Sequence, residues 1–287
     1  MQKIAVLSDI HGNYLALEQC IKYALEHEIS TFIFLGDYVG ELAYPQKTME
    51  LIEHLRSLYT CYFVKGNKED YWINYQMNGE MGWKDKDSTT GSLLYTYTHL
   101  REKDISFFKE LPIMKEVCIE GMPPITICHG SPRKVNKKMK PNDEETLHIL
   151  EQNSTDIILC GHTHIQCKIE HNGRKIFNPG AVGVPLHSGG QSQFMILNGI
   201  DGEWKEEWIS LCYDVEQTIE DLYQSGLSEM APYWCRVTEN LLRTGEVSHG
   251  SVLAEAMKYC KEETGECIWP NIPEQYWKRA VEVILGK

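Results

Sequence analysis

The first 70 residues alternate short apolar runs with amphipathic helical patterns. The apolar runs are residues 4–7, 31–35 and 61–64, and each one ends in a group of polar residues. Such alternation is typical of βαβ units, in which the strands are parallel and helices cover the sheet. Binding sites in these folds form beyond the carboxyl ends of the strands, so the polar residues that follow the runs are candidates for chemistry.

The middle of the chain continues the mixed α/β pattern after an irregular helical stretch that ends near residue 111. Short strands are predicted at 117–119, 125–128 and 157–160. A helix is predicted over 144–152, because Asn142-Asp143 offers good N-cap residues in front of it. These elements extend the α/β core well beyond the first three strands.

Two hairpins are predicted next. Asn172-Gly173 indicates a type I′ turn between strands at 168–171 and 174–177. The second hairpin joins 194–197 to 204–209, and its connection contains Asn198-Gly199 and Asp201-Gly202.

Only helices are predicted after residue 214. Their ranges are 215–222, 233–242, 252–259 and 276–285. We therefore divide the chain into an α/β domain over residues 1–211 and a helical C-terminal extension over residues 212–287. The extension could cap a site on the first domain or form a homodimer interface, and the sequence leaves both roles open.

Charge and cysteine content limit the partners and the compartment. The 287 residues carry 28 Lys and Arg against 41 Asp and Glu, a net charge of −13, which disfavours nucleic acid as a partner. No run approaches the 18 or more apolar residues of a membrane helix, so a membrane is not expected as a partner. The ten cysteines form no C-x-x-C pair, and the N-terminus has too few apolar residues for a signal peptide. We therefore expect a cytoplasmic protein with reduced thiols.

Five short motifs each follow an apolar run of strand length. They are Asp9-Ile10-His11, Gly36-Asp37, Gly66-Asn67, His129-Gly130 and Gly161-His162-Thr163-His164. Together they supply two carboxylates, one amide oxygen and four imidazoles. Calcium needs more carboxylates and structural zinc favours thiolates, whereas this mixture suits Mn, Fe, Co, Ni or Zn. Seven groups serve two metal ions if one carboxylate bridges them.

The ordered set of motifs resembles the calcineurin-like metallophosphoesterase superfamily over roughly residues 3–211. The resemblance implies a four-layer α/β/β/α sandwich with a dinuclear metal site at the sheet edges. It assigns the first metal to Asp9, His11, Asp37 and His164. It assigns the second metal to Asp37, Asn67, His129 and His162, with Asp37 as the bridge.

The same resemblance implies a hydrolase that cleaves phosphoester or phosphoanhydride bonds with a metal-bridging hydroxide. Asp37 and His129 would then take part in catalysis as well as metal binding. We expect two divalent transition-metal ions, with Mn and Fe ranked ahead of Zn, Ni and Co. The expected partner is a small phosphorylated substrate, with nucleotides among the candidates.

One residue departs from the pattern of the family. Members that hydrolyse phosphomonoesters well usually carry His after Gly-Asn, whereas this chain has Lys68. Lys68 either points to solvent or, as a candidate catalytic and substrate-binding residue, binds a substrate oxygen. An ammonium donates protons poorly unless its pKa is depressed. This substitution predicts a preference for phosphodiesters or phosphoanhydrides over alkyl monoesters, whose alkoxide leaving groups need protonation.

Two further features could shape the substrate pocket. The basic run that begins with Arg133 and Lys134 and continues through Lys137, Lys138 and Lys140 is either a solvated loop or a clamp for additional phosphates. Four aromatic residues follow the third motif and either stack a nucleobase or simply pack in the core. They are Tyr71, Trp72, Tyr75 and Trp83.

Two alternatives to the general hydrolase remain. The basic run and the aromatic residues would also suit a symmetrical dinucleotide polyphosphate hydrolase. A protein of this fold could instead be a non-catalytic, metal-binding interaction scaffold, although a scaffold has no physical need to keep all seven ligand groups.

Overall fold

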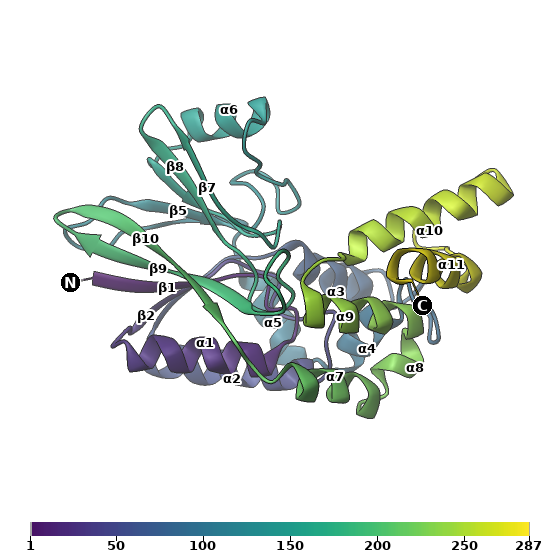
Figure 1. Cartoon of the computed structure of the whole chain (residues 1–287). Coiled ribbons are helices and arrows are strands. Elements are labelled where there is room, and N and C mark those ends of the chain that lie inside the picture. The colour runs from purple at the N-terminus through teal and green to yellow at the C-terminus, as the bar shows by residue number, and fades with distance from the viewer. Residues whose placement is uncertain (1, 287) are drawn as a thin grey trace.

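The computed structural model describes residues 2–286 and contains two five-stranded sheets packed face to face (Figure 1). The first sheet has the order β10-β9-β1-β2-β3. Its strands are β1 (Gln2–Leu7), β2 (Thr31–Phe34), β3 (Thr60–Phe63), β9 (Ser192–Ile200) and β10 (Glu203–Leu211). β1, β2 and β3 are parallel, as the βαβ pattern predicts, whereas β9 is antiparallel to β1 and to β10.

The second sheet has the order β4-β5-β6-β8-β7. Its strands are β4 (Met114–Val117), β5 (Ile125–Cys128), β6 (Ile157–Leu159), β7 (Gln166–His171) and β8 (Arg174–Pro179). The strand predicted at 117–119 was placed too late, because pairing with β5 ends at Val117. The chain then turns, with the Met122 amide donating to the Ile119 carbonyl and Gly121 at a φ of 76°.

Both predicted hairpins form, and one of them has a shorter turn than expected. Asn172 and Gly173 have φ values of 50° and 79° between β7 and β8, as a type I′ turn requires. In the second hairpin Asn198 pairs with Lys3 of β1 and with Lys205 of β10, so it belongs to the ladder. The turn therefore consists of Asp201-Gly202 alone, and β9 is longer than predicted.

The sheets form the two inner layers of a four-layer sandwich. The outer layers contain α1 (Tyr14–Glu26) and α2 (Pro45–Leu58) on one side and α6 (Glu144–Gln152) on the other. Alternation along β1 shows how the layers are joined: Ala5 and Leu7 pack in the cluster that includes α1, whereas Ile4 and Val6 pack between the sheets. The predicted α/β/β/α architecture is confirmed.

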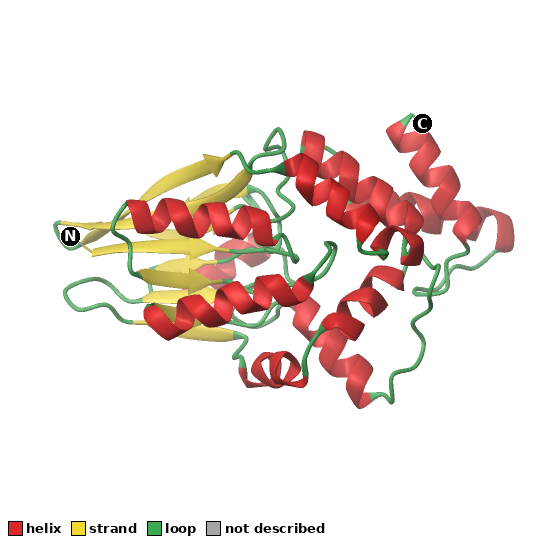
Figure 2. Cartoon of the chain, turned by 90° about the horizontal axis from the view of Figure 1, so that it is seen from below, coloured by secondary structure: helices red, strands yellow, loops and turns green. Residues whose placement is uncertain are grey.

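The remaining helices lie beyond the carboxyl ends of the parallel strands (Figures 1 and 2). Three of them, α3 (Asn67–Met77), α4 (Gly91–His99) and α5 (Glu102–Glu110), fill the irregular region after β3. The C-terminal helices are α7 (Val215–Gln224), α8 (Leu227–Met230), α9 (Pro232–Thr244), α10 (His249–Thr264) and α11 (Glu274–Leu285). All four helices predicted after residue 214 therefore form. Within residues 2–286 no helix has the length and apolarity needed to cross a bilayer.

The C-terminal helices pack against the α/β core. Ile219 and Leu222 of α7 share a buried cluster with Leu42, which follows β2, and with Val184, which precedes β9. A second buried cluster joins α9, α10 and α11, with Trp277 fully buried in it. This packing brings the extension over the strand ends, while the domain boundary at residue 211 stays a prediction.

Candidate metal centre

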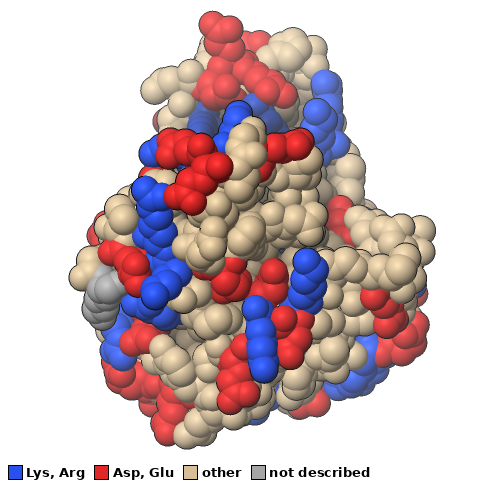
Figure 3. Space-filling view, turned by 90° about the vertical axis from the view of Figure 1, so that its right-hand side faces the viewer, with Lys and Arg blue, Asp and Glu red and all other residues tan. Residues whose placement is uncertain are grey.

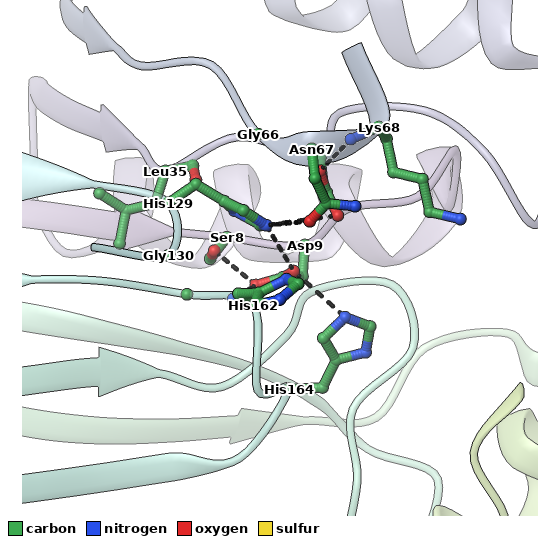
Figure 4. Close-up of polar contacts among 12 residues, drawn as sticks. Ser8, Asp9, Leu35, Gly66, Asn67, Lys68, His129, Gly130, His162 and His164 are labelled. Atoms are coloured by element: carbon green, nitrogen blue, oxygen red, sulfur yellow. Dashed lines mark hydrogen bonds and ion pairs between the residues drawn. The ribbon is translucent and has the colours of Figure 1, made fainter. Parts of the chain in front are cut away.

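The ends of five parallel strands bring the seven candidate ligands together. Asp9 and His11 follow β1, and Asp37 follows β2. Asn67 begins α3 after β3, His129 follows β5, and His162 and His164 follow β6. Figure 4 shows Asp9, Asn67, His129, His162 and His164 pointing toward one another. The two sheets therefore contribute to one site from their facing edges.

The candidate ligands form two groups, each with ligand atoms within 4.8 Å of one another: Asp9, His11 and His164, and Asp37, His129 and His162. In the first group His164 Nε2 lies 3.1 Å from Asp9 Oδ1 and 3.2 Å from His11 Nε2. In the second group His129 Nε2 lies 3.4 Å from Asp37 Oδ2. Each group contains three of the four residues that the family resemblance assigns to one metal, and the full ligand assignment stays a prediction.

Asp37 lies between the two groups. Its Oδ2 is 3.7 Å from His11 Nε2 of the first group and 3.4 Å from His129 Nε2 of the second. Its other oxygen, Oδ1, accepts a hydrogen bond of 2.8 Å from the Lys68 backbone amide, which holds the carboxylate in place. Asn67 lies on the side of the second group, with Oδ1 3.1 Å from His129 Nε2. The position of Asp37 between His11 and His129 suits a carboxylate that bridges two ions.

One oxygen of Asp9 accepts no hydrogen bond within the described part of the metal-free site. Asp9 is fully buried, and its Oδ2 accepts hydrogen bonds from Ser8 Oγ at 2.6 Å and from the His162 amide at 2.9 Å. Its Oδ1 has no hydrogen-bond partner among the described residues. A buried carboxylate oxygen without a partner is costly unless a positive charge lies beside it. The donor set therefore fits divalent metal ions, with Asp9 Oδ1 directed at the first.

Backbone carbonyls orient the imidazoles. Nδ1 of His129 lies 2.8 Å from the Leu35 carbonyl and Nδ1 of His164 lies 3.0 Å from the Val184 carbonyl. Because a carbonyl can only accept, each Nδ1 carries the proton and Nε2 keeps a lone pair for a metal. In His162 the two ring nitrogens exchange roles. Its Nε2 lies 3.2 Å from the Asn136 carbonyl and carries the proton, so Nδ1 is left for coordination.

Five of the candidate ligands have left-handed backbone conformations. The φ values are 53° for Asp9, 52° for His11, 54° for Asp37, 66° for His162 and 60° for His164. Positive φ is uncommon in residues other than glycine, and such strain tends to gather at functional sites. Backbone hydrogen bonds between neighbouring strand ends hold these conformations, as in the 3.1 Å bond from the Asp9 amide to the Gly36 carbonyl. The loops are therefore fixed in the geometry that turns the side chains inward.

Burial and charge together alter the acid–base properties of the site. Burial lowers the pKa of His11, but Glu41, Asp9 and Asp37 outweigh it and raise the pKa to about 10. Burial likewise lowers the pKa of His129, and the charges of Asp37 and Asp9 raise it to about 9. Burial raises the pKa of Asp9, yet the neighbouring His164 and His129 hold it well below its usual value. Without metal, the centre is thus a set of ionised carboxylates neutralised by protonated imidazoles.

Glu41 is a residue of this site that the motifs do not reveal. It lies in the loop between β2 and α2 with 5% of its surface exposed. Its Oε2 lies 2.5 Å from His11 Nδ1, and its Oε1 forms an ion pair with Lys68 Nζ. None of the five motifs includes Glu41. The one sequence signal for it was an acidic residue four positions after the candidate ligand Asp37.

Of the two positions considered for Lys68 from the sequence, the structure excludes the one that points to solvent. Its side chain is 13% exposed, so it does not point to solvent. It lines the cavity in front of the candidate ligands, but Glu41 already pairs with its ammonium group. A direct contact between Lys68 and substrate stays a prediction.

A cavity of about 270 Å³ opens in front of the two ligand groups. His11, Asp37 and His164 form part of its lining, and Lys138 is the member of the basic run that reaches it. Arg133 and Lys134 are not brought into the cavity: both are exposed, and the Arg133 guanidinium donates to Gln152 Oε1 at 2.9 Å. Both residues lie outside this cavity lining, and their role in substrate binding stays a prediction.

The four aromatic residues after the third motif divide between core and cavity. Trp72 is fully buried, and Tyr75 stacks on Trp83 with ring centroids 3.8 Å apart. Tyr71 lines the cavity. The sequence did not indicate that most of the aromatic lining comes from the C-terminal helices.

Charged side chains of both signs are interspersed over the face that Figure 3 shows.

Comparison with known families agrees with the fold and the site. The profile of the calcineurin-like phosphoesterase superfamily domain matches residues 2–201, which include all seven candidate ligands. The chain therefore belongs to the calcineurin-like phosphoesterase superfamily. The family and the two ligand groups together support divalent metal ions and the hydrolysis of phosphoesters.

The similarity to individual relatives covers more of the chain than the family domain does. The protein named "Uncharacterized protein MJ0912" of Methanocaldococcus jannaschii is 26% identical over 247 residues, covering 79% of this chain and 94% of the relative. A metallophosphoesterase from Sphaerobacter thermophilus has a TM-score of 0.68 at 24% identity and covers 85% of this chain and 99% of its own. Hypothetical protein PH1004 from Pyrococcus horikoshii OT3 has a TM-score of 0.71 at 20% identity and covers 86% of this chain and 100% of its own. Both structures show the same fold.

Proposed function

We propose that this protein is a two-metal hydrolase that cleaves phosphodiester or phosphoanhydride bonds of small phosphorylated molecules. The position of Asp37 carries the proposal, because one oxygen of its carboxylate faces both ligand groups. We assign Asp9, His11, Asp37 and His164 to the first ion and Asp37, Asn67, His129 and His162 to the second. Mn and Fe are the ions we rank first, since mixed imidazole and carboxylate ligands suit them.

Two bound ions would polarise the phosphoryl group and lower the pKa of water at the site. The residues of the chain prepare the site for this chemistry. The imidazoles of His129 and His164 are held by carbonyl groups, so no reorganisation is needed when substrate arrives. Lys138 adds a positive charge to the lining of the cavity, which favours an anionic substrate. Burial of the two aspartates limits competing contacts with water.

The substrate preference follows from Lys68 and Glu41. An alkoxide leaves readily only when a group protonates it, and the ammonium of Lys68 is held by the Glu41 carboxylate. Burial lowers the pKa of Lys68, but the charges of Glu41 and Asp37 outweigh it and raise the pKa above its ordinary value, so the proton is not readily donated. Phenolates and nucleotide phosphates need no such proton. We therefore expect better activity on aryl diesters and anhydrides than on alkyl monoesters.

The test is hydrolysis of bis-p-nitrophenyl phosphate, glycerol phosphate and a dinucleotide tetraphosphate, each with Mn²⁺ and with chelator. We expect Mn²⁺-dependent turnover that ranks glycerol phosphate last. Asp37→Asn keeps the shape of the bridging residue while removing its charge, and we expect it to lower turnover about 100-fold or more. An Asp156→Asn variant, changed at an exposed residue outside the cavity, is the matched control.

Each outcome bears on a separate part of the proposal. If glycerol phosphate is the best substrate, the substrate preference is wrong and the hydrolase remains. If metal binds tightly and no substrate is cleaved with Mn²⁺, Fe²⁺ or Zn²⁺, the protein is a metal-binding scaffold instead.

A further inference from the structure

The cavity in front of the ligand groups has a second wall that is aromatic and belongs to the C-terminal helices. Trp234 of α9, His249 of α10 and Trp269 of the loop between α10 and α11 line it. Tyr71 of α3 completes this wall from the α/β core. We name these four residues the aromatic wall. One continuous cavity thus joins a polar, charged side to an aromatic side.

Two members of the aromatic wall are partly exposed. Tyr71 is 36% exposed and Trp269 is 39% exposed, and their ring centroids are 6.0 Å apart at 43° between the planes. Trp72, the chain neighbour of Tyr71, is instead fully buried in the core. Both partly exposed rings line the cavity, so part of each ring is free to contact a ligand there.

Trp234 supplies an independent observation. It is 8% exposed and its indole Nε1 has no hydrogen-bond partner among the described residues. His249 stacks on the Trp234 ring at 4.2 Å, and its Nε2 lies 2.8 Å from Thr238 Oγ1. A buried donor without an acceptor is costly, so the Trp234 side chain is not fully satisfied by its contacts within the described residues, and this residue lines the cavity.

Lys68 connects the aromatic wall to the metal centre. Its ammonium lies 5.8 Å from the Tyr71 ring centroid and 5.7 Å from the Trp234 ring centroid, while its backbone amide donates to Asp37. A group that contacts the aromatic wall therefore lies close to a phosphate held at the candidate ligands. The volume of about 270 Å³ is at the lower end of ligand cavities, which suits one nucleotide unit rather than a whole dinucleotide.

We propose that the aromatic wall is a subsite for a nucleobase, so that the hydrolase acts on substrates with a nucleoside next to the phosphoryl group. The inference rests on the proposed function and specifies its substrate class. Aromatic side chains bind planar rings by stacking, and the partly exposed rings of Tyr71 and Trp269 offer surface for it at the cavity. The C-terminal extension then contributes to substrate recognition in addition to covering the site.

The test compares adenosine 5′-monophosphate with ribose 5-phosphate, which differ only in the base. Calorimetric titration of the Mn²⁺-loaded protein should give a dissociation constant about 5- to 150-fold lower for the nucleotide, the range expected of one stacked base. Trp269→Ala should remove most of this difference, and Trp269→Phe should keep it. Tyr71→Leu is a second variant at a partly exposed position. Trp208→Ala is the matched control, because Trp208 is 36% exposed on β10 and does not line the cavity.

The outcomes separate the subsite from the hydrolase. Equal affinity for the two ligands in the unchanged protein, with hydrolysis of bis-p-nitrophenyl phosphate intact, overturns the nucleobase subsite alone. A preference for the nucleotide that survives both Trp269→Ala and Tyr71→Leu also overturns it. Loss of the preference in these variants but not in Trp208→Ala supports it, whereas absence of hydrolysis on every substrate overturns the proposed function.

Discussion

Oε2 of Glu41 lies 2.5 Å from Nδ1 of His11, so a buried carboxylate orients the imidazole of the first ligand group. The opposite nitrogen of that ring, Nε2, faces His164 Nε2 at 3.2 Å. Carboxylates that contact metal-binding histidines fix the ring and raise its basicity. Lys68 pairs with the other oxygen of Glu41 and offsets its negative charge.

Replacing Glu41 should therefore weaken metal binding without removing a ligand. We expect Glu41→Gln to raise the dissociation constant for Mn²⁺ at the first group about 10- to 100-fold, as is typical of such outer contacts. Calorimetric titration with Mn²⁺ measures the effect. Glu53→Gln is the control, because Glu53 forms an exposed ion pair with Lys103. Equal Mn²⁺ affinity in Glu41→Gln and the unchanged protein would show that His11 is positioned without Glu41.

Lys68→His should change the ranking of substrates. A histidine at this position can donate a proton to an alkoxide, and general acid catalysis contributes at least about 100-fold when the geometry is good. We expect kcat/KM for glycerol phosphate relative to bis-p-nitrophenyl phosphate to rise about tenfold or more. Lys68→Met removes the charge and supplies no donor, so it should leave the ratio unchanged. A rise of the same size in both variants would contradict the role assigned to proton donation.

Metal binding should release protons near neutral pH. His11 has a pKa of about 10 and His129 a pKa of about 9 in the metal-free protein, so both are protonated at pH 7 and must lose a proton to bind metal. Titration with Mn²⁺ in buffers of different ionisation enthalpy counts the protons released. The count should fall as the pH rises through 9 and 10 and approach zero only above pH 10. Binding without proton release at pH 7 would be inconsistent with these two residues as ligands.

The raised pKa values of His11 and His129 also predict how the stability of the metal-free protein depends on pH. Both pKa values lie above the ordinary 6.5, so protonation stabilises the metal-free fold fully below about pH 6.5. This contribution is lost as the pH rises through 9 to 10. The Tm of the chelator-treated protein should therefore fall between pH 7 and 10 more steeply than the Tm of the metal-loaded protein. Parallel curves for the two forms would contradict the prediction.

Gly161 fits where no larger residue can. A Cβ atom at this position would overlap Ser8 Oγ and lie 2.6 Å from Asp9 Oδ2. We expect Gly161→Ala to lower the free energy of unfolding by about 1–3 kcal/mol and to weaken metal binding, because Asp9 must move. Gly250→Ala is the control, since the nearest atom to its added Cβ is 3.9 Å away. Urea denaturation measures stability, and equal midpoints for the two variants would disagree with the predicted overlap.

The sequence pattern predicted a mixed α/β core and the gathering of the motifs, and the resemblance to the family implied the four layers. Alternation of apolar residues identifies a strand, and in a parallel sheet the residues after each strand meet at one edge. Asp9 and Asp37, which follow neighbouring strands of one sheet, could therefore be placed together, whereas His129 follows a strand of the second sheet and reaches them because the two sheets pack face to face. The type I′ turn at Asn172-Gly173 was equally clear, because both of its residues favour positive φ.

Other features depend on packing that a sequence pattern does not encode. Glu41 becomes part of the site only because its loop folds back onto His11 and Lys68. The aromatic wall forms because α9 and α10 pack over the strand ends, and amphipathic helices do not reveal which surface they cover. Arg133 and Lys134 follow the ligand candidate His129 closely in sequence, yet both are exposed and lie outside the cavity lining.

The most direct test of the account is the number of metal ions bound per chain. Native mass spectrometry of the protein loaded with Mn²⁺ should show two ions, and Asp37→Asn should show one ion or none because the bridge is lost. His171→Asn, changed at a histidine that pairs with Glu151 outside the cavity, should retain two. A single ion in the unchanged protein, or two ions retained in Asp37→Asn, would contradict a dinuclear centre bridged by Asp37.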